Sequence, residues 1–261
     1  MITSASNVQV KNIIQLQKKA RARRQQRMFV TEGVRMFREA PEEMISRIYV
    51  SESFLQDPQH RKLLEGRKWE VLSDPVFSRV SDTKTPQGIL CLIKMPDHDP
   101  EQLLLNADPG GIWLVLENVQ DPGNLGTMFR TGEGAGIAGV IMDKNTADIY
   151  NPKTIRSTMG SIFRVPFAIA DSPADMIRLL KERRIRVYGA HLAGSVCYDE
   201  PDYTEGTAFL IGNEGNGLTE ETAALADQNI RIPMEGRLES LNAAMAAGIL
   251  MYEASRQRRR K

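Results

Sequence analysis

Short apolar runs alternate with segments of helical periodicity from Trp113 onward, and this alternation constrains the fold more than any other feature. Strands are predicted at 113–119, 138–142, 163–169, 185–191, 207–212 and 229–233. Helices are predicted near 124–134, 152–160, 173–183, 219–226 and 240–257. Strands that are apolar along most of their length are typical of a parallel sheet with helices on both faces. The sequence therefore predicts an α/β fold with a mostly parallel sheet.

A smaller α/β unit is predicted ahead of this domain. Its helices are expected at 11–27, 34–40, 58–65 and from 74 onward, and its strands at 48–50, 70–72 and 88–94. Proline and glycine then punctuate the chain at Pro96, Pro100, Pro109, Gly110 and Gly111. We therefore expect a first domain at 1–97, a linker at 98–111 and a second domain at 112–261.

Composition argues against several classes of protein. Of the 261 residues, 41% are hydrophobic and 26% are charged, as in globular proteins, and no apolar run is long enough to span a bilayer. The polar start, Met1 to Val10, argues against a secretory signal, and we expect a cytoplasmic protein. The histidines and cysteines lack the spacing of metal ligands, so we expect no metal site and two reduced thiols, Cys91 and Cys197.

Basic residues gather at both ends of the chain, although the net charge is only +1. Such an uneven distribution suggests a polyanionic partner that meets a local basic patch. A solvated helix face and a frayed C-terminal tail would explain the same charges. The candidate contacts near the N-terminus are Lys18, Lys19, Arg21, Arg23, Arg24 and Arg27.

Three glycine-rich turns follow predicted strands of the second domain. They span residues 121–126, 212–218 and 232–242. In open α/β sheets ligands lie beyond the carboxyl ends of the strands, where glycine lets the backbone approach them closely. Each turn alone could be an ordinary connection, but three of them together predict a binding site at that edge of the sheet.

A dinucleotide-binding site is excluded by context. Residues 134–139 match the pattern G-x-G-x-x-G, but that fingerprint should follow a strand and open a helix. Here it closes a predicted helix and precedes a strand, so we expect a glycine of this segment to serve as a helix C-cap. A phosphate-binding P-loop is also excluded, because the sequence contains no Gly-Lys-Ser or Gly-Lys-Thr.

The three turns carry distinctive residues in a distinctive order. The first reads Asp-Pro-Gly-Asn-Leu-Gly with Arg130-Thr131, the second Gly-Asn-Glu-Gly-Asn-Gly-Leu, and the third Ile-Pro-Met with Ser240-Leu241-Asn242. Together they resemble the signature motifs of the SpoU (TrmH-type) RNA 2′-O-methyltransferases of the SPOUT superfamily. Phe29-x-x-Glu32-Gly33 and Thr-Pro-Gln-Gly at 85–88 resemble the RNA-binding substrate domain often fused ahead of that catalytic domain.

The resemblance implies an S-adenosylmethionine-dependent enzyme that methylates a ribose 2′-hydroxyl of RNA. It implies a homodimer whose catalytic domain carries a trefoil knot. Because an RNA substrate is a polyanion, we expect the basic residues between Lys18 and Arg27 to bind it. The cofactor would be held by Leu192, Gly212, Ile232, Met234 and Leu241. The catalytic site would consist of Asn124, Arg130, Glu214, Ser240 and Asn242.

Each polar site residue also has a structural explanation. Asn124 and Ser240 could cap the helices that follow them, and Arg130 could form an ion pair with Glu214. The family is usually described as using this arginine to activate the hydroxyl. Because a guanidinium normally stays protonated, we favour Arg130 as a clamp on the neighbouring phosphate, positioned by Glu214. The third motif departs from the family pattern, since Ala243-Ala244 stands where Val-Ser is common.

Two other functions fit the same residues. A tRNA ribose methyltransferase is the alternative within the class, and the separate N-terminal domain favours ribosomal RNA over tRNA. A non-catalytic RNA-binding or ribosome-assembly factor that retains a cofactor pocket is the alternative outside it. Cofactor titration followed by methyl transfer to RNA distinguishes an enzyme from a binding protein.

Overall fold

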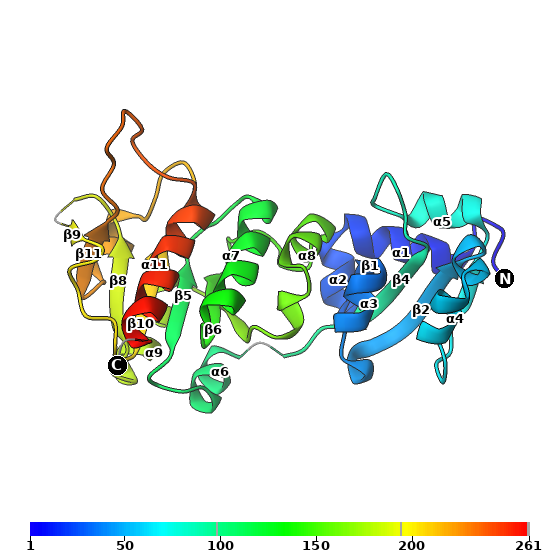
Figure 1. The fold of residues 1–261 in the computed structure, drawn as a ribbon, viewed down its shortest axis with the longest axis horizontal. Helices are drawn as coiled ribbons and strands as arrows, with labels where there is room; N and C mark the ends of the chain where they lie inside the picture. The colour runs from blue at the N-terminus through cyan, green and yellow to red at the C-terminus, as the bar shows by residue number, and fades with distance from the viewer. Residues whose placement is uncertain (98, 194, 260–261) are drawn as a thin grey trace. The chain divides into compact units, whose positions relative to one another are not determined.

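The computed structural model describes residues 1–97, 99–193 and 195–259, which form two compact units (Figure 1). The first unit comprises Met1–Pro96 and Asp148–Phe163. The second comprises Asp97–Ala147 and Arg164–Lys261. The division is therefore not a single cut in the chain, because residues 148–163 leave the second unit and return to it. None of the helices in the described residues has the length and apolar content that crossing a lipid bilayer requires.

The first unit is built on a four-stranded sheet with the order β1-β4-β2-β3. β4 pairs antiparallel with β1 and β2, and β3 pairs parallel with β2. The strands are β1 Met28–Glu32, β2 Ile45–Ser51, β3 Glu70–Leu72 and β4 Ile89–Lys94. The helices are α1 Val8–Lys18, α2 Ala20–Gln26, α3 Val34–Glu39, η1 Glu42–Met44, η2 Ser53–Gln56, α4 Pro58–Leu63, α5 Asp74–Val80, α8 Pro152–Thr158 and η3 Ser161–Phe163.

The predicted helix at 11–27 is two helices, α1 and α2. Lys19 adopts an extended conformation, with φ −123° and ψ 109°, and ends the first helix before the second begins. The break lets Val10, Ile13 and Leu16 of α1 pack into the core of this unit, while α2 turns towards β1. The prediction of one continuous basic helix was therefore wrong.

Residues 148–163 complete the core of the first unit. The ring of Tyr150 lies 4.7 Å from that of Phe29, and the ring of Phe163 lies 6.4 Å from it. The carboxylate of Asp148 accepts hydrogen bonds from the buried guanidinium of Arg23 at 2.5 and 3.1 Å. This segment lies inside the predicted second domain at 112–261, yet it packs with residues of the first.

The second unit contains a seven-stranded sheet with the order β7-β6-β5-β10-β8-β11-β9, and all of its strand pairs are parallel. The predicted mixed α/β fold with a parallel sheet is confirmed. The strands are β5 Ile112–Leu116, β6 Gly139–Asp143, β7 Phe167–Ala170, β8 Arg186–Ala190, β9 Val196–Cys197, β10 Thr207–Ile211 and β11 Gln228–Arg231.

Helices cover both faces of this sheet. α7 (Pro122–Ala135) and α11 (Ala243–Arg258) pack against each other, and α11 lies on β5 and β10 (Figure 1). α9 (Pro173–Glu182) packs against four strands, β5 to β8, and against α6 (Pro100–Asn106). The predicted linker at 98–111 therefore contains a helix. α10 (Glu220–Ala224) packs on β8.

A polar cap followed by proline starts α7, α8 and α9. Asp121 accepts a hydrogen bond from a backbone N–H of α7 just ahead of Pro122, and Asn151 and Ser172 do the same ahead of Pro152 and Pro173. Proline is preorganised for the first helical turn and lacks the N–H that would be left unpaired there. At the other end of α7, Gly136 has φ 76° and caps the helix, as predicted for this glycine-rich segment.

Candidate active site

The candidate active site lies at the carboxyl ends of the central strands in the second unit. The loops that leave β5, β8, β10 and β11 there begin at residues 117, 191, 212 and 232. From β5 the chain continues to β6 and β7 on one side of the sheet, whereas β8 and β11 lie on the other side. Such a reversal of strand order opens a crevice that ligands occupy in α/β sheets.

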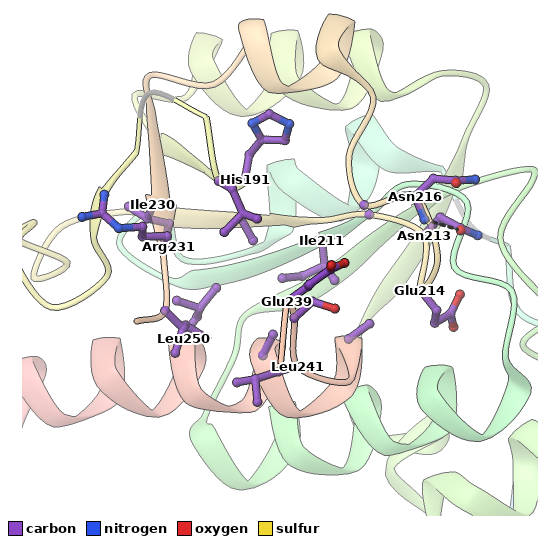
Figure 2. A pocket seen from close by; sticks show the side chains of 18 of the residues that line it. His191, Ile211, Asn213, Glu214, Asn216, Ile230, Arg231, Glu239, Leu241 and Leu250 are labelled. Atoms are coloured by element: carbon purple, nitrogen blue, oxygen red, sulfur yellow. Dashed lines mark hydrogen bonds between the residues drawn. The ribbon is translucent and has the colours of Figure 1, made fainter. Parts of the chain in front are cut away.

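A cavity of about 350 Å³ lies at this edge, with strand ends on one side and α11 on the other (Figure 2). That volume falls within the range of small-molecule sites. Its walls are mostly apolar, with side chains from β8, β10, β11 and α11. All the residues predicted to hold the cofactor line it: Leu192, Gly212, Ile232, Met234 and Leu241.

Gly212 is required by a close approach of backbone to backbone. A Cβ atom at this position would lie 2.1 Å from the carbonyl carbon of Gly217 and 2.2 Å from the backbone nitrogen of Leu218. Gly217 itself has φ 70°, a left-handed conformation that suits glycine. The loop thus folds back on the end of β10, with the backbone of Gly217 against Gly212.

Asn213 holds this loop in shape, a role that the sequence did not predict. Its backbone exchanges two hydrogen bonds with Gly217, of 3.0 and 2.8 Å. Its side-chain oxygen accepts from the N–H groups of Gly215 and Asn216, and its amide nitrogen donates 2.9 Å to the carbonyl of Asn118. In the sequence, the sign of this role is the asparagine that directly follows Gly212 in the second motif.

Glu214 binds the first motif through three hydrogen bonds. Its carboxylate accepts from the backbone N–H groups of Gln120 and Asp121, both at 2.9 Å, and from the side-chain amide of Asn124 at 3.1 Å. Burial acts to raise the pKa of Glu214, but these donors outweigh it and hold the pKa below its ordinary value. Glu214 therefore stays ionised and joins the loops after β5 and β10.

A directed chain of amides links the third motif to the first and second. The side-chain oxygen of Asn242 accepts from the N–H groups of Ala244 and Met245, which caps α11. Its nitrogen must therefore point away from the helix, and it donates 2.9 Å to the side-chain oxygen of Asn124. The nitrogen of Asn124 donates in turn to Glu214. Helix α11 thus sets the orientation of both amides.

This geometry corrects two alternative explanations. Asn124 does not cap the helix of the first motif, because Asp121 is its cap and Asn124 lies in the first turn. Ser240 does not cap the last helix, because Asn242 does. Ser240 instead lies exposed in the loop ahead of α11 and lines the cavity.

A second, polar hollow adjoins the cavity and gathers most of the predicted catalytic residues. It is lined by Asn124, Glu214, Ser240 and Asn242, together with Gln120 and Asp121. Asn213, Glu214, Ser240, Leu241 and Ala243 line both hollows. A ligand in the apolar cavity and a polar group in the second hollow would therefore meet at this shared border.

Arg130 is the one predicted catalytic residue that does not line the polar hollow. It is exposed on α7, six residues beyond Asn124, which corresponds to about 9 Å along a helix. It makes no hydrogen bond or ion pair with the rest of the described residues. The predicted pairing of Arg130 with Glu214 was wrong, because Glu214 is occupied by N–H donors.

Two buried carboxylates, those of Glu117 and Asp143, stabilise the backbone next to the site. Glu117 accepts from the N–H and hydroxyl of Thr219 and from the hydroxyl of Thr222, at 2.6 to 2.9 Å, which ties the end of β5 to the start of α10. Asp143 accepts from the N–H of Asn118 at 3.0 Å. Neither carboxylate was predicted from the sequence, although an acid directly after an apolar strand was a usable signal.

Most of the basic residues predicted to bind RNA are exposed on the first unit. Lys18, Lys19, Arg21 and Arg24 are exposed, and so is Arg27, which also donates to the carbonyl of Pro96 at 3.0 Å. Arg23 is the exception, with 3% of its surface exposed, and it binds Asp148 and the carbonyls of Leu16 and Gln17. The prediction that Arg23 meets RNA was therefore wrong.

The two motifs assigned to the substrate domain, at 29–33 and 85–88, hold the same loop in place. Glu32 accepts from the hydroxyls of Ser81 and Thr83 and from the N–H of Asp82. The side-chain oxygen of Gln87 accepts 2.8 Å from the N–H of Val34 at the start of α3. These contacts hold residues 81–87 against the ends of β1 and β4 and leave Lys84 exposed.

Histidine, cysteine, aspartate and glutamate residues form no group of three or more that could hold a metal ion in residues 1–97, 99–193 and 195–259. His191 lines the cavity, with its Nε2 atom 3.5 Å from Glu220.

Comparison with known proteins covers nearly the whole chain. The model of the SpoU rRNA Methylase family matches residues 111–252, and that of the MRM3-like substrate binding domain matches residues 7–91. The 23S rRNA (guanosine(2553)-2′-O)-methyltransferase RlmP of Bacillus subtilis (strain 168) is 37% identical over 253 residues. The match covers 96% of this chain and 97% of that protein.

Solved structures give the same picture. An AdoMet-bound rRNA methyltransferase from Sinorhizobium meliloti matches with a TM-score of 0.85 and 34% identity, over 98% of this chain and 97% of that one. A protein studied for 2-OH methylation of C/U34 on tRNA matches with a TM-score of 0.53 and 30% identity. That match covers 59% of this chain and 100% of the other.

Proposed function

Because this chain belongs to the SpoU rRNA methylase family, we propose that it methylates a ribose 2′-hydroxyl of 23S ribosomal RNA with S-adenosylmethionine as methyl donor. The observation that carries the proposal is the convergence of three motif loops on one apolar cavity and one polar hollow. The 23S rRNA substrate is that of a relative that spans nearly the whole chain. We also propose that the enzyme acts in the cytoplasm, where such RNA would be modified.

The size and the mostly apolar lining of the cavity suit S-adenosylmethionine. A side chain at position 212 would collide with the backbone of Gly217 and Leu218, so glycine keeps this loop folded at the edge of the cavity, which residues 212–217 line. The side chains of Leu192, Ile232, Met234 and Leu241 can pack around an adenosyl group, while the backbone at Gly212 can hydrogen-bond to it. When bound, the cofactor supplies an electrophilic methyl group on a positively charged sulfur.

In the polar hollow, the protein's task is to orient the ribose and exclude water. Asn124 and Asn242 each have one amide hydrogen that the protein does not use, and these can bind oxygens of the RNA. The hydroxyl of Ser240 can bind the 2′-oxygen. Glu214 acts as a positioning residue, because its three hydrogen bonds make it a weak proton acceptor. The hydroxyl proton leaves to phosphate or water.

Arg130 is proposed to clamp a phosphate of the RNA. Its guanidinium is exposed and engages no other group of the described residues. A guanidinium stays protonated and binds phosphate with two parallel hydrogen bonds, which suits it to orient the RNA rather than to accept a proton. Glu214 of the same chain does not position it, and we propose that the RNA phosphate orients it.

Ribosomal RNA is favoured over tRNA by the first unit. The structure linked to tRNA methylation matches 59% of this chain, whereas the rRNA methyltransferases match it over almost its full length. The MRM3-like substrate binding domain matches residues 7–91, which belong to the first unit. This unit therefore supports a large structured RNA as the substrate.

We further propose that the enzyme is a homodimer and that its catalytic unit carries a trefoil knot. Two large apolar side chains of α11, Met245 and Tyr252, are 60% and 45% exposed and lie seven residues apart, on one face of the helix. β11 lies towards one edge of the sheet, and the chain then returns to the centre, where α11 packs on β5 and β10. Light scattering on the purified protein tests the dimer.

The decisive experiment maps 2′-O-methyl groups in total RNA from cells with and without the gene. We expect one 23S rRNA position to lose its methyl group in the deletion strain and to regain it when purified enzyme and cofactor are added. A lost methyl group in tRNA would establish the alternative substrate. Cofactor binding without any methyl transfer would establish a non-catalytic RNA-binding protein.

A further inference from the structure

Glu239 is an acidic side chain of the cavity whose charge no described residue pairs. It belongs to the loop at 232–242, is exposed, and lines the cavity. Figure 2 shows it among the side chains at the middle of the cavity, near Ile211 and Leu241. In the described part of the chain it forms no hydrogen bond or ion pair.

The other ionisable groups of the cavity have protein partners. Glu214 accepts three hydrogen bonds from the first motif. Arg231 donates to the carbonyl of Ser195, and His191 lies 3.5 Å from Glu220. A ligand that fills the cavity would remove water from Glu239. That loss is unfavourable unless the ligand brings a positive charge.

The position of Glu239 indicates which end of the cavity the positive charge of the ligand should occupy. It directly precedes Ser240 and Leu241, which line both the cavity and the polar hollow. In the proposed reaction, the methyl group passes from a donor in the cavity to a hydroxyl in the hollow. The positively charged sulfur of the donor must therefore approach the border next to Glu239.

We propose that Glu239 recognises the positive charge of the sulfonium and thereby favours S-adenosylmethionine over the product S-adenosylhomocysteine. In methyl transfer the carbon–sulfur bond breaks, a carbon–oxygen bond forms, and the bonding electrons return to sulfur. The hydroxyl proton is released to phosphate or water, and the sulfur becomes a neutral thioether. The attraction to Glu239 thus exists before transfer and is lost after it, which assists product release.

This inference rests on the proposed function, since it takes S-adenosylmethionine as the ligand. Calorimetric titration of the full-length protein with both ligands tests it. In Glu239→Gln we expect the Kd for S-adenosylmethionine to rise about 3–10-fold, the effect of losing one partly exposed charge pair. The Kd for S-adenosylhomocysteine should not change. The matched control is Glu235→Gln, which removes an exposed carboxylate of the same loop that does not line the cavity.

Salt gives a second readout, because a charge interaction in a solvent-accessible cavity weakens as ionic strength rises. The preference of the wild type for S-adenosylmethionine should shrink with salt, whereas that of Glu239→Gln should stay flat. If Glu239→Gln raised the Kd of both ligands by the same factor, the inference would be overturned. Glu239 would then lie beside the α-ammonium group, which both ligands carry. Unchanged affinities with a lower kcat would overturn it in favour of Glu239 as a proton acceptor. A wild type that binds neither ligand would overturn the proposed function as well.

Discussion

At the scale of single residues, Asn242 joins two roles that substitution can separate. Its oxygen caps α11, and its nitrogen donates to Asn124. Serine caps helices about as well as asparagine but has no amide to reach Asn124. We expect Asn242→Ser to keep stability within about 0.5 kcal/mol and Asn242→Ala to lose about 1 kcal/mol in urea unfolding.

Both variants should lose methyl transfer by about 10²-fold or more, the typical effect of removing one preorganised donor. Single-turnover rates at saturating cofactor measure this loss. Because Asn242→Ser retains the cap, its rate separates catalysis from folding. Full activity in the serine variant would show that the amide chain is only structural.

Arg130 provides a test of phosphate binding. We expect Arg130→Ala and Arg130→Lys to lose activity by a similar factor, about 10²–10³, because a lysine ammonium does not reproduce the two parallel hydrogen bonds of a guanidinium. Neither change should alter the urea midpoint, since Arg130 is exposed and engages no other described residue. Rescue of the rate by lysine would contradict the clamp, and a loss of stability in both variants would indicate a structural role.

The sequence predicted which residues surround the site better than it predicted what those residues contact. Leu192, Gly212, Ile232, Met234 and Leu241 line one cavity because their motifs follow parallel strands, whose carboxyl ends share an edge. The contacts of charged groups depend on distant partners. Arg23 is buried against Asp148, 125 residues away, and no local pattern reveals such a pairing.

At the scale of elements, the 212–218 loop depends on glycine for space. In Gly212→Ala the new Cβ would meet backbone atoms of Gly217 and Leu218 at about 2.2 Å, so the loop must move. We expect a loss of about 1–3 kcal/mol or more in the free energy of unfolding, together with loss of cofactor binding in calorimetry. Gly236→Ala is the matched control, because nothing lies within 4 Å of its Cβ position. Equal behaviour of the two variants would show that the loop adapts to a side chain.

The helices α1 and α2 carry the predicted RNA contacts, and the burial of Arg23 changes which of them can take part. If three of the exposed residues Lys18, Lys19, Arg21 and Arg24 bind phosphates, their replacement by glutamine should flatten the salt dependence of RNA binding by about 0.7 per contact. Filter binding at several salt concentrations measures the slope. Arg23→Gln should instead lower stability by on the order of 3 kcal/mol, because it leaves Asp148 without its partner. An unchanged slope in the first variant would mean that these residues form only a solvated face.

Element boundaries were the least predictable part of the fold. The order of strands and helices in the second unit follows from apolar periodicity, which survives in the structure. Apolar periodicity did not predict the break at Lys19, the helix at 100–106 or the short strand β9, all of which the structure contains. Short elements carry too few residues for a periodic signal, and their ends are set by contacts with other parts of the chain.

At the scale of the whole molecule, the chain passes between its two units three times, at residues 96–97, 147–148 and 163–164. The sequence predicted a single crossing, through the linker at 98–111. Residues 148–163 follow β6 in sequence, and the helix predicted near 152–160 fits the alternation of strands and helices that predicts the second domain. Their packing with the first unit therefore could not be anticipated from periodicity.

This excursion determines how a truncated protein should behave. The domain boundaries predicted from the sequence imply that a chain beginning near Asp108 folds and binds S-adenosylmethionine. A truncated protein that begins at Asp97 keeps α6, but the loss of residues 1–96 uncovers Ile149, Tyr150, Ile155 and Ile162, which are 1% to 6% exposed in the intact chain. Exposed apolar clusters of this kind promote association. We therefore expect the truncated protein to aggregate and to bind a hydrophobic dye, which light scattering and fluorescence measure.

A second truncated variant separates this effect from loss of the cofactor site. With Ile149, Tyr150 and Ile155 replaced by serine, the truncated chain should remain dispersed and bind S-adenosylmethionine with wild-type affinity, because the cavity consists of residues 190–250. It should still modify RNA poorly, since the substrate unit is absent. A dispersed, cofactor-binding protein without these replacements would contradict the role of residues 148–163 as part of the first unit. Failure of both truncated forms to bind cofactor would show instead that the catalytic unit needs its substrate unit to fold.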